Sequence, residues 1–184
     1  VVTQAVGCSN SPFERNVKNE KNAETVVNLI NSLNKKKKFI ELKLHHTHRQ
    51  KFNGFYFNKY FKNLDINKNF HDNYFKLLKK SRLVFFNYDS TGLLENLSLN
   101  IPSVSFWHDT YSHLNEDYVQ KYKKLVEAKI LFEDFNQLLD HINKYWDNID
   151  QWWFNTRTQK IIKEFNDNFN INNQNYKNLT YILK

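Results

Sequence analysis

Residues 83–86, Leu-Val-Phe-Phe, form an unbroken apolar run with a helix-like apolar period on either side. Such a run is typical of a strand that is buried on both faces, whereas a half-buried strand alternates apolar and polar residues. Both faces of a strand are covered when connecting helices pack above and below a parallel sheet. The run therefore predicts an α/β fold with a parallel sheet flanked by helices.

Other segments extend this alternation of strands and helices. We expect strands at residues 1–6, 39–44 and 103–107, with an edge strand at 128–132. We expect helices at residues 23–33, 71–80, 91–100, 138–146 and 149–169, and a loop at 7–12. Residues 50–69 have no clean period and are expected to be irregular, with a short helix near 55–61. The order predicts a doubly wound, Rossmann-like sheet with a helical C-terminal extension.

The length of 184 residues fits one domain, and a hydrophobic content of 40% excludes a disordered or fibrous chain. No window approaches the roughly 20 consecutive apolar residues of a membrane-spanning helix. The single cysteine, Cys8, has no partner for an internal disulfide, which fits the cytoplasm. The chain has no methionine and opens directly into an apolar strand-like run, so we expect it to be the C-terminal part of a longer protein.

The net charge of +8 raises nucleic acid as a partner, because clustered basic residues neutralise phosphates. The excess is mostly lysine scattered among Asn, Ile, Phe and Tyr, which is typical of an AT-rich coding sequence. We therefore expect no nucleic-acid partner. A basic face would instead help the protein approach an acidic glycan acceptor or the anionic lipids of the inner membrane, as a peripheral contact.

The polar segment after residues 83–86 is the main candidate site, because ligands of open parallel sheets bind beyond the carboxyl ends of the strands. Ser90 or Thr91 would cap the next helix and face a phosphate together with the free amides of its first turn. Gly92 would let a phosphate approach the backbone. Glu95, one turn further, would reach a ribose diol. An ordinary helix cap without any ligand explains the same spacing.

The segments 81–84, 89–95 and 97–102 resemble the donor-site motif of GT-B glycosyltransferases. In that motif a strand leads into a Ser/Thr-containing turn, then into a helix that carries a Glu, and then into an Asn-Ile-Pro exit. Residues 106–107, 132–134, 141–146 and 149–153 are similar to bacterial surface-carbohydrate transferases, whose C-terminal half ends in a strand, an acidic loop and a Trp-Trp helix. The resemblance covers about residues 81–169 and is weak before them.

The resemblance implies one half of a GT-B fold that binds a nucleotide sugar, with no further cofactor, and transfers the sugar to a surface glycan. The acceptor and the catalytic base would belong to the missing N-terminal domain. Asp109 and Glu116, and also Asp117, would face the acceptor side. Two alternatives remain from other classes of protein: a non-catalytic nucleotide or phosphate-binding module, and a basic domain that contacts nucleic acid or membrane surfaces.

His45 and His46 follow the predicted strand 39–44, where the more distantly similar Kdo and sialic acid transferases carry a His-Pro pair that meets a CMP-activated sugar. Histidine replaces that proline here, so contact with the phosphate or base, a metal site that includes His48, and an ordinary loop all remain open. We expect no metal, because no Cys, Asp or Glu flanks the cluster in a known metal-binding spacing. Trp152 and Trp153, with Trp146, could form a stacking surface for a sugar, but we expect them to pack against the sheet or the missing domain. Cys8 is expected to be a buried or incidental thiol.

Overall fold

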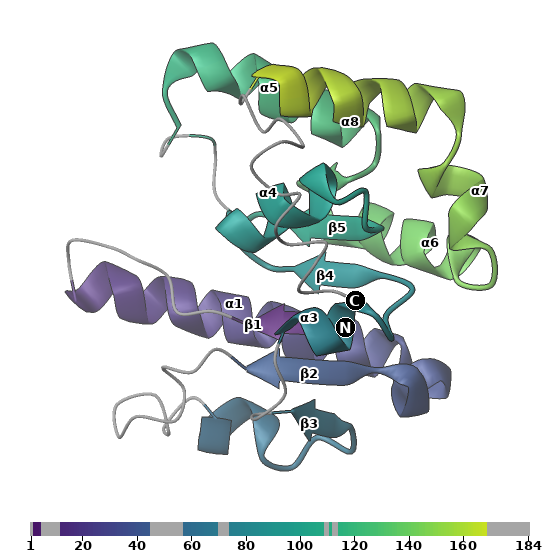
Figure 1. Cartoon of the computed structure of the whole chain (residues 1–184). Helices are drawn as coiled ribbons and strands as arrows, with labels where there is room; N and C mark the ends of the chain where they lie inside the picture. The colour runs from purple at the N-terminus through teal and green to yellow at the C-terminus, as the bar shows by residue number, and fades with distance from the viewer. Residues whose placement is uncertain are drawn as a thin grey trace.

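The computed structural model describes residues 2–4, 12–44, 57–69, 74–108, 111 and 114–168 (Figure 1). Its sheet contains six strands that all run parallel: β1 (Val2–Gln4), β2 (Glu41–Leu44), β3 (Asn67–Asn69), β4 (Val84–Phe86), β5 (Ser103–Phe106) and β6 (Leu131–Phe132). The strand order is β3-β2-β1-β4-β5-β6. The predicted Rossmann-like parallel sheet flanked by helices is thereby confirmed.

The helices follow the strands along the chain. They are α1 (Pro12–Ser32), the 3₁₀ helix η1 (Asn34–Phe39), the π-helical turn η3 (Phe57–Phe61), α3 (Tyr74–Leu78), α4 (Thr91–Ser98), α5 (Glu116–Glu127), α6 (Phe135–Tyr145), α7 (Ile149–Trp153) and α8 (Thr156–Asn168). Parallel crossovers are right-handed, so α1, which leads to β2, and α4, which leads to β5, cover opposite faces of the sheet. Contacts of α8 with α4 and α5 place these three helices on one face (Figure 1).

The core is one continuous hydrophobic cluster on both faces of the central strands. All three residues of β4 and all four of β5 are buried, as the apolar run at 83–86 predicts. The two serines of β5 are also buried, and their hydroxyls have hydrogen-bond partners. Ser103 Oγ accepts from Asn96 Nδ2 at 2.9 Å, and Ser105 Oγ accepts from Trp107 Nε1 at 3.0 Å. Small side chains here let α4 and the loop after β5 approach the sheet.

Several predicted boundaries are wrong. The first helix begins at Pro12 instead of residue 23. Proline is favourable at a first helical position, because its missing amide hydrogen would have no partner there. The prediction missed this start because residues 12–22 contain few apolar residues to reveal a period. The expected irregular segment 50–69 contains β3, whose Asn-Lys-Asn sequence has no apolar pattern and which pairs only with β2. The predicted helix 149–169 breaks at Phe154, and the Asn155 side chain accepts the Thr158 N–H at 2.9 Å to start α8.

The element predicted at residues 128–132 is an edge strand, β6, which confirms that prediction. The lysine run at residues 35–38 lies in the 3₁₀ helix η1, which follows α1. Beyond β6, the chain consists of α6, α7 and α8, so the predicted helical C-terminal extension is also confirmed. None of the described helices combines the length and the apolar character needed to cross a bilayer.

Candidate functional site

The strand order reverses between β1 and β4, which are neighbours although they are far apart in the chain. The chain moves from β1 toward β2 and β3 in one direction, and from β4 toward β5 and β6 in the other. The helices that follow β1 and β4, α1 and α4, cover opposite faces of the sheet, and ligands of open parallel sheets bind beyond the carboxyl ends of the strands at such a reversal point. Residues 5–11, the loop after β1, lie outside the described residues. The loop after β4 ends at Ser90, and Thr91 begins α4.

The loop after β4 ends in a capped helix start. Ser90 has an extended backbone, and its Oγ accepts the Leu93 N–H at 3.2 Å, so Ser90 is the N-cap of α4. Thr91, the first residue of α4, is exposed. The Ser90 oxygen thus satisfies one amide of the first turn, and the positive end of the helix dipole lies at the carboxyl edge of the sheet beside an exposed hydroxyl.

Gly92 is required by packing within the protein. A Cβ atom placed at Gly92 would lie 3.0 Å from Cε1 of Phe86, and the Phe86 ring is buried. The absence of a side chain lets the start of α4 lie directly on the end of β4. The close approach of backbone and aromatic ring explains this glycine without a ligand, which differs from the role that the sequence suggested.

Glu95 lies one turn after Thr91 and is half-buried. Burial raises the pKa of its carboxyl group above the ordinary value. Tyr74 of α3 lies nearby: its hydroxyl donates to Asn96 Oδ1 at 3.1 Å, and burial first and the Glu95 charge second raise its pKa. Glu95 is therefore held in a partly desolvated position next to α3, where a hydrogen bond to a diol would be stronger than in water.

The carboxyl edge of the sheet also includes residues for which the sequence suggested no role. Asn87 Nδ2 donates to the Asn22 carbonyl of α1 at 2.9 Å, and the Thr25 hydroxyl of α1 is hydrogen-bonded to His108 Nε2. His108 follows β5 and is exposed. These contacts connect α1 to the loops after β4 and β5. The position of His108 directly after a predicted strand was the signal that could have identified it.

Two further pairs lie along the same edge. The Tyr122 hydroxyl of α5 donates to Asp89 Oδ1 at 3.4 Å, which connects the loop after β4 to α5. Burial raises the pKa of Tyr111, and the carboxylate of Glu133, which follows β6, adds to this shift. The loops after β4, β5 and β6 thus all place ionisable groups at the carboxyl edge, with acidic and neutral groups intermixed.

The remaining predicted site residues are placed only in part. His45, His46 and His48, which follow β2, lie outside the described residues, as do Cys8 and Asp109. Glu116 is exposed and is the first residue of α5, where Asn115 is the N-cap. Within the described ranges, no group of three or more His, Cys, Asp or Glu side chains could hold a metal ion.

The Asn-Ile-Pro and Trp-Trp patterns meet in the core. Asn100, after the end of α4, has a left-handed backbone with φ of 55°. Trp153 is fully buried, and its Nε1 donates to Asn100 Oδ1 at 2.9 Å, while Gln159 Nε2 donates to the same oxygen at 3.0 Å. Trp152 is also buried and donates to the Ala128 carbonyl at 2.9 Å. Trp152 and Trp153 are thus packed inside the protein as expected, whereas Trp146 is half-buried.

Comparison with known proteins gives one family. The model of a family described as LIC12162 family transferase matches residues 7–181. No curated protein and no solved structure matches the chain. The transferase part of the predicted resemblance is confirmed, while the GT-B type and the similarity to Kdo and sialic acid transferases stay predictions. Because the match covers nearly the whole chain, this protein belongs to the LIC12162 family of transferases.

Proposed function

We propose that this transferase moves a sugar from a nucleotide-sugar donor to a cell-surface glycan, and that this chain is the donor-binding half of a GT-B enzyme. The observation that carries the proposal is the position of the α4 start, which follows β4 at the point where the strand order reverses. An exposed threonine, a capped helix end and a half-buried carboxylate lie together there. These groups suit a phosphate and a ribose.

Each group has a separate role in this proposal. The first-turn amides of α4 and the Thr91 hydroxyl bind the donor phosphate, while Ser90 keeps the helix end in place through its bond to the Leu93 N–H. Glu95 accepts hydrogen bonds from the ribose hydroxyls. His45 or His46 contacts the phosphate or the base, with a CMP-activated sugar as the favoured donor. No metal or other cofactor takes part in the proposal.

Catalysis would depend on charge stabilisation. As the bond to the sugar breaks, negative charge develops on the nucleotide phosphate, and helix amides and hydroxyls fixed in advance stabilise that charge without reorganising. Asp109 and Glu116 lie after β5 in the chain and would face the acceptor. The catalytic base and most of the acceptor site belong to the other domain, so this chain alone would bind a donor without transferring its sugar.

A thermal-shift screen against CMP, UDP, GDP and ADP tests the proposal. We expect one nucleotide to raise the melting temperature, because a ligand that binds only the folded state stabilises it. Thr91→Val and Glu95→Gln should each weaken binding of that nucleotide about 10-fold or more, since the first removes a hydrogen bond to the phosphate and the second removes the charge that strengthens the hydrogen bonds from the ribose. The matched controls are Thr156→Val, an exposed threonine at the start of α8, and Glu127→Gln, an exposed glutamate on α5.

The controls should leave nucleotide affinity unchanged. No shift with any nucleotide, or a shift that survives both Thr91→Val and Glu95→Gln, would contradict the proposed site. Nucleotide sugars separate the enzyme from a non-catalytic nucleotide module. A transferase donor site discriminates among sugars on the preferred nucleotide, whereas equal affinity for the nucleotide with and without every sugar would favour the binding module.

A further inference from the structure

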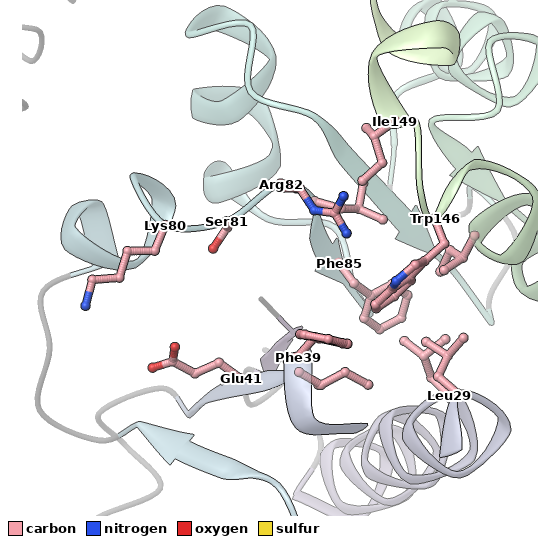
Figure 2. A pocket seen from close by; sticks show the side chains of 13 residues that line it. Leu29, Phe39, Glu41, Lys80, Ser81, Arg82, Phe85, Trp146 and Ile149 are labelled. Atoms are coloured by element: carbon pink, nitrogen blue, oxygen red, sulfur yellow. The ribbon is translucent and has the colours of Figure 1, made fainter. Parts of the chain in front are cut away.

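An apolar pocket of about 250 Å³ lies at the opposite edge of the sheet, beside the amino ends of β2 and β4 (Figure 2). Its walls come from α1, α6 and the start of α7, with Phe85 of β4 as its floor. The apolar residues that line it include Leu29, Leu33, Phe85, Ile142, Trp146 and Ile149. Because the pocket is at the amino ends of the strands, it is separate from the candidate donor site at their carboxyl ends.

The mouth of this pocket is basic. Lys80 and Arg82 line it from the turn between α3 and β4, and both are exposed. Neither side chain forms a hydrogen bond or ion pair in the part of the chain that the structure describes. Figure 2 shows Arg82 on the side of Phe85 and Trp146, whereas the charged end of Lys80 points away from the apolar residues. Glu41 is the acidic residue that lines the pocket.

An exposed aromatic residue stands at the same mouth. Phe39, at the end of η1, has 67% of its surface exposed, the largest value among the exposed large apolar residues that the structure describes. It lines the pocket and follows the lysine run 35–38. Lys36 of that run lies over the Trp146 ring, with its Nζ 4.8 Å from the ring centre. Basic and aromatic groups thus come from three separate segments: η1, the turn before β4 and the end of α6.

We propose that this edge, defined by Phe39, Lys80, Arg82 and Trp146, docks the protein on an anionic lipid bilayer. An exposed aromatic side chain enters the boundary between headgroups and acyl chains, and surrounding basic residues are attracted to the lipid phosphates. The basic groups extend over a surface around the pocket, including exposed Lys35 and Lys79, which matches a layer of headgroups better than one small anion. Docking by this edge leaves the carboxyl edge of the sheet facing away from the bilayer.

Flotation of the whole chain with vesicles tests the inference. We expect binding to vesicles that contain phosphatidylglycerol, weaker binding as salt rises, and no binding to pure phosphatidylcholine. The Lys80→Ala/Arg82→Ala double variant should lower partitioning about 30-fold, since each basic residue near an anionic surface contributes roughly a fivefold factor. Phe39→Ser should lower it as well, because the inserted ring is lost.

Matched variants of residues that do not line the pocket serve as controls. Phe154→Ser removes another exposed aromatic residue, with 54% of its surface exposed, and Lys123→Ala/Lys163→Ala removes two exposed lysines of α5 and α8. Both should bind vesicles like the original chain. Tryptophan fluorescence gives a second readout: Trp107, Trp152 and Trp153 are buried, so a blue shift on vesicle binding should come from half-buried Trp146 and disappear in Trp146→Phe.

Four results would overturn the inference. They are absence of binding to anionic vesicles, equal loss of binding in the control and edge variants, competition by inorganic phosphate at matched ionic strength, and a dimer in sedimentation that Phe39→Ser dissociates. Phosphate competition would assign the mouth to a small anion, and the dimer would assign it to a second copy of the chain. Nucleotide binding is independent of these outcomes, because Phe39, Lys80 and Arg82 lie at the other edge of the sheet.

Discussion

At the residue scale, His141 is a titratable side chain that is surrounded by aromatic rings. Its ring is packed by Trp152, Tyr145 and Phe132, with ring centres at 4.5, 4.9 and 5.2 Å. The Nε2 atom is buried and has no hydrogen-bond partner in the described parts of the chain. Burial, with a smaller effect from Lys129 and Lys144, lowers the pKa of His141 from 6.5 to about 4. The folded protein therefore keeps this histidine neutral.

The low pKa of His141 makes stability depend on pH. The unfolded chain takes up a proton at its ordinary pKa and the folded chain does not, so this contribution is complete above about pH 6.5 and is lost as the pH falls toward 4. We expect protonation linked to His141 to lower the free energy of unfolding by about 2 kcal/mol across that range. This value is smaller than the full pKa shift would give, because the ring is partly solvent-accessible. Urea unfolding at several pH values measures it.

His141→Phe should flatten the pH profile in this range, because an aromatic ring without a titrating group fits the same surroundings. The carboxylate of Glu164, whose pKa the Lys124 ammonium lowers, remains in the variant and provides the residual acid dependence. An unchanged slope in His141→Phe would show that other groups cause the loss of stability. The sequence could not indicate this environment, since it depends on rings from β6, α6 and α7 that meet only in the fold.

At the element scale, the contact between the end of β4 and the start of α4 determines where the candidate site lies. We predict that Gly92→Ala lowers the free energy of unfolding by about 1 kcal/mol. Alanine favours a helix over glycine by roughly 1 kcal/mol, but a methyl group 3.0 Å from the buried Phe86 ring costs about 1–3 kcal/mol, and at a helix start the cost prevails. Chemical denaturation measures the change.

The double variant Gly92→Ala/Phe86→Leu separates the two roles of this glycine. Phe86→Leu is itself destabilising because the ring is buried, but the smaller side chain makes room for the methyl group. The two substitutions should therefore be non-additive, and the double variant should be about as stable as Phe86→Leu alone. If the double variant matches Phe86→Leu in stability and still binds nucleotide, packing explains Gly92. A more stable Gly92→Ala variant would contradict the packing account.

The elements that the sequence predicted best are those with a strong apolar pattern. Residues 83–86 indicated β4 because both faces are buried, and the alternation at 39–44 indicated β2. β3 could not be predicted because Asn-Lys-Asn contains no apolar residue, and its assignment depends on pairing with β2. The start of α1 was missed because residues 12–22 are mostly polar and show no apolar period. The period appears only from residue 23 onward, although the helix begins earlier.

At the scale of the whole molecule, the order of the strands is the property that most influences the function. The sequence predicted that ligands bind at the carboxyl ends of parallel strands, and it indicated Ser90, Thr91 and Glu95 from their place after one strand. It could not show that β1 and β4 are neighbours, because that pairing joins residues more than 80 positions apart. The pairing is made by backbone hydrogen bonds, and side-chain patterns carry no information about them. The reversal point is therefore a result of the structure alone.

The same limit applies to the second surface. The lysine run 35–38 and the residues Lys80 and Arg82 are separate in the chain, and the pocket between them exists only because α1 and α6 cover the same face of the sheet. The chain thus carries a candidate donor site at one edge of the sheet and, at the other, an apolar pocket with basic residues at its mouth. Independent variants at the two edges can separate their contributions.

Amide chemical-shift mapping can show whether the start of α4 binds the phosphate of a nucleotide. With the uniformly ¹⁵N-labelled chain and the nucleotide that gives the largest thermal shift, we predict the largest changes at the amides of residues 90–93. The amides of Phe39, Arg82 and Ile142 at the opposite edge should stay unchanged. Saturating nucleotide that leaves residues 90–93 unperturbed, or that perturbs only the opposite edge, would contradict the account.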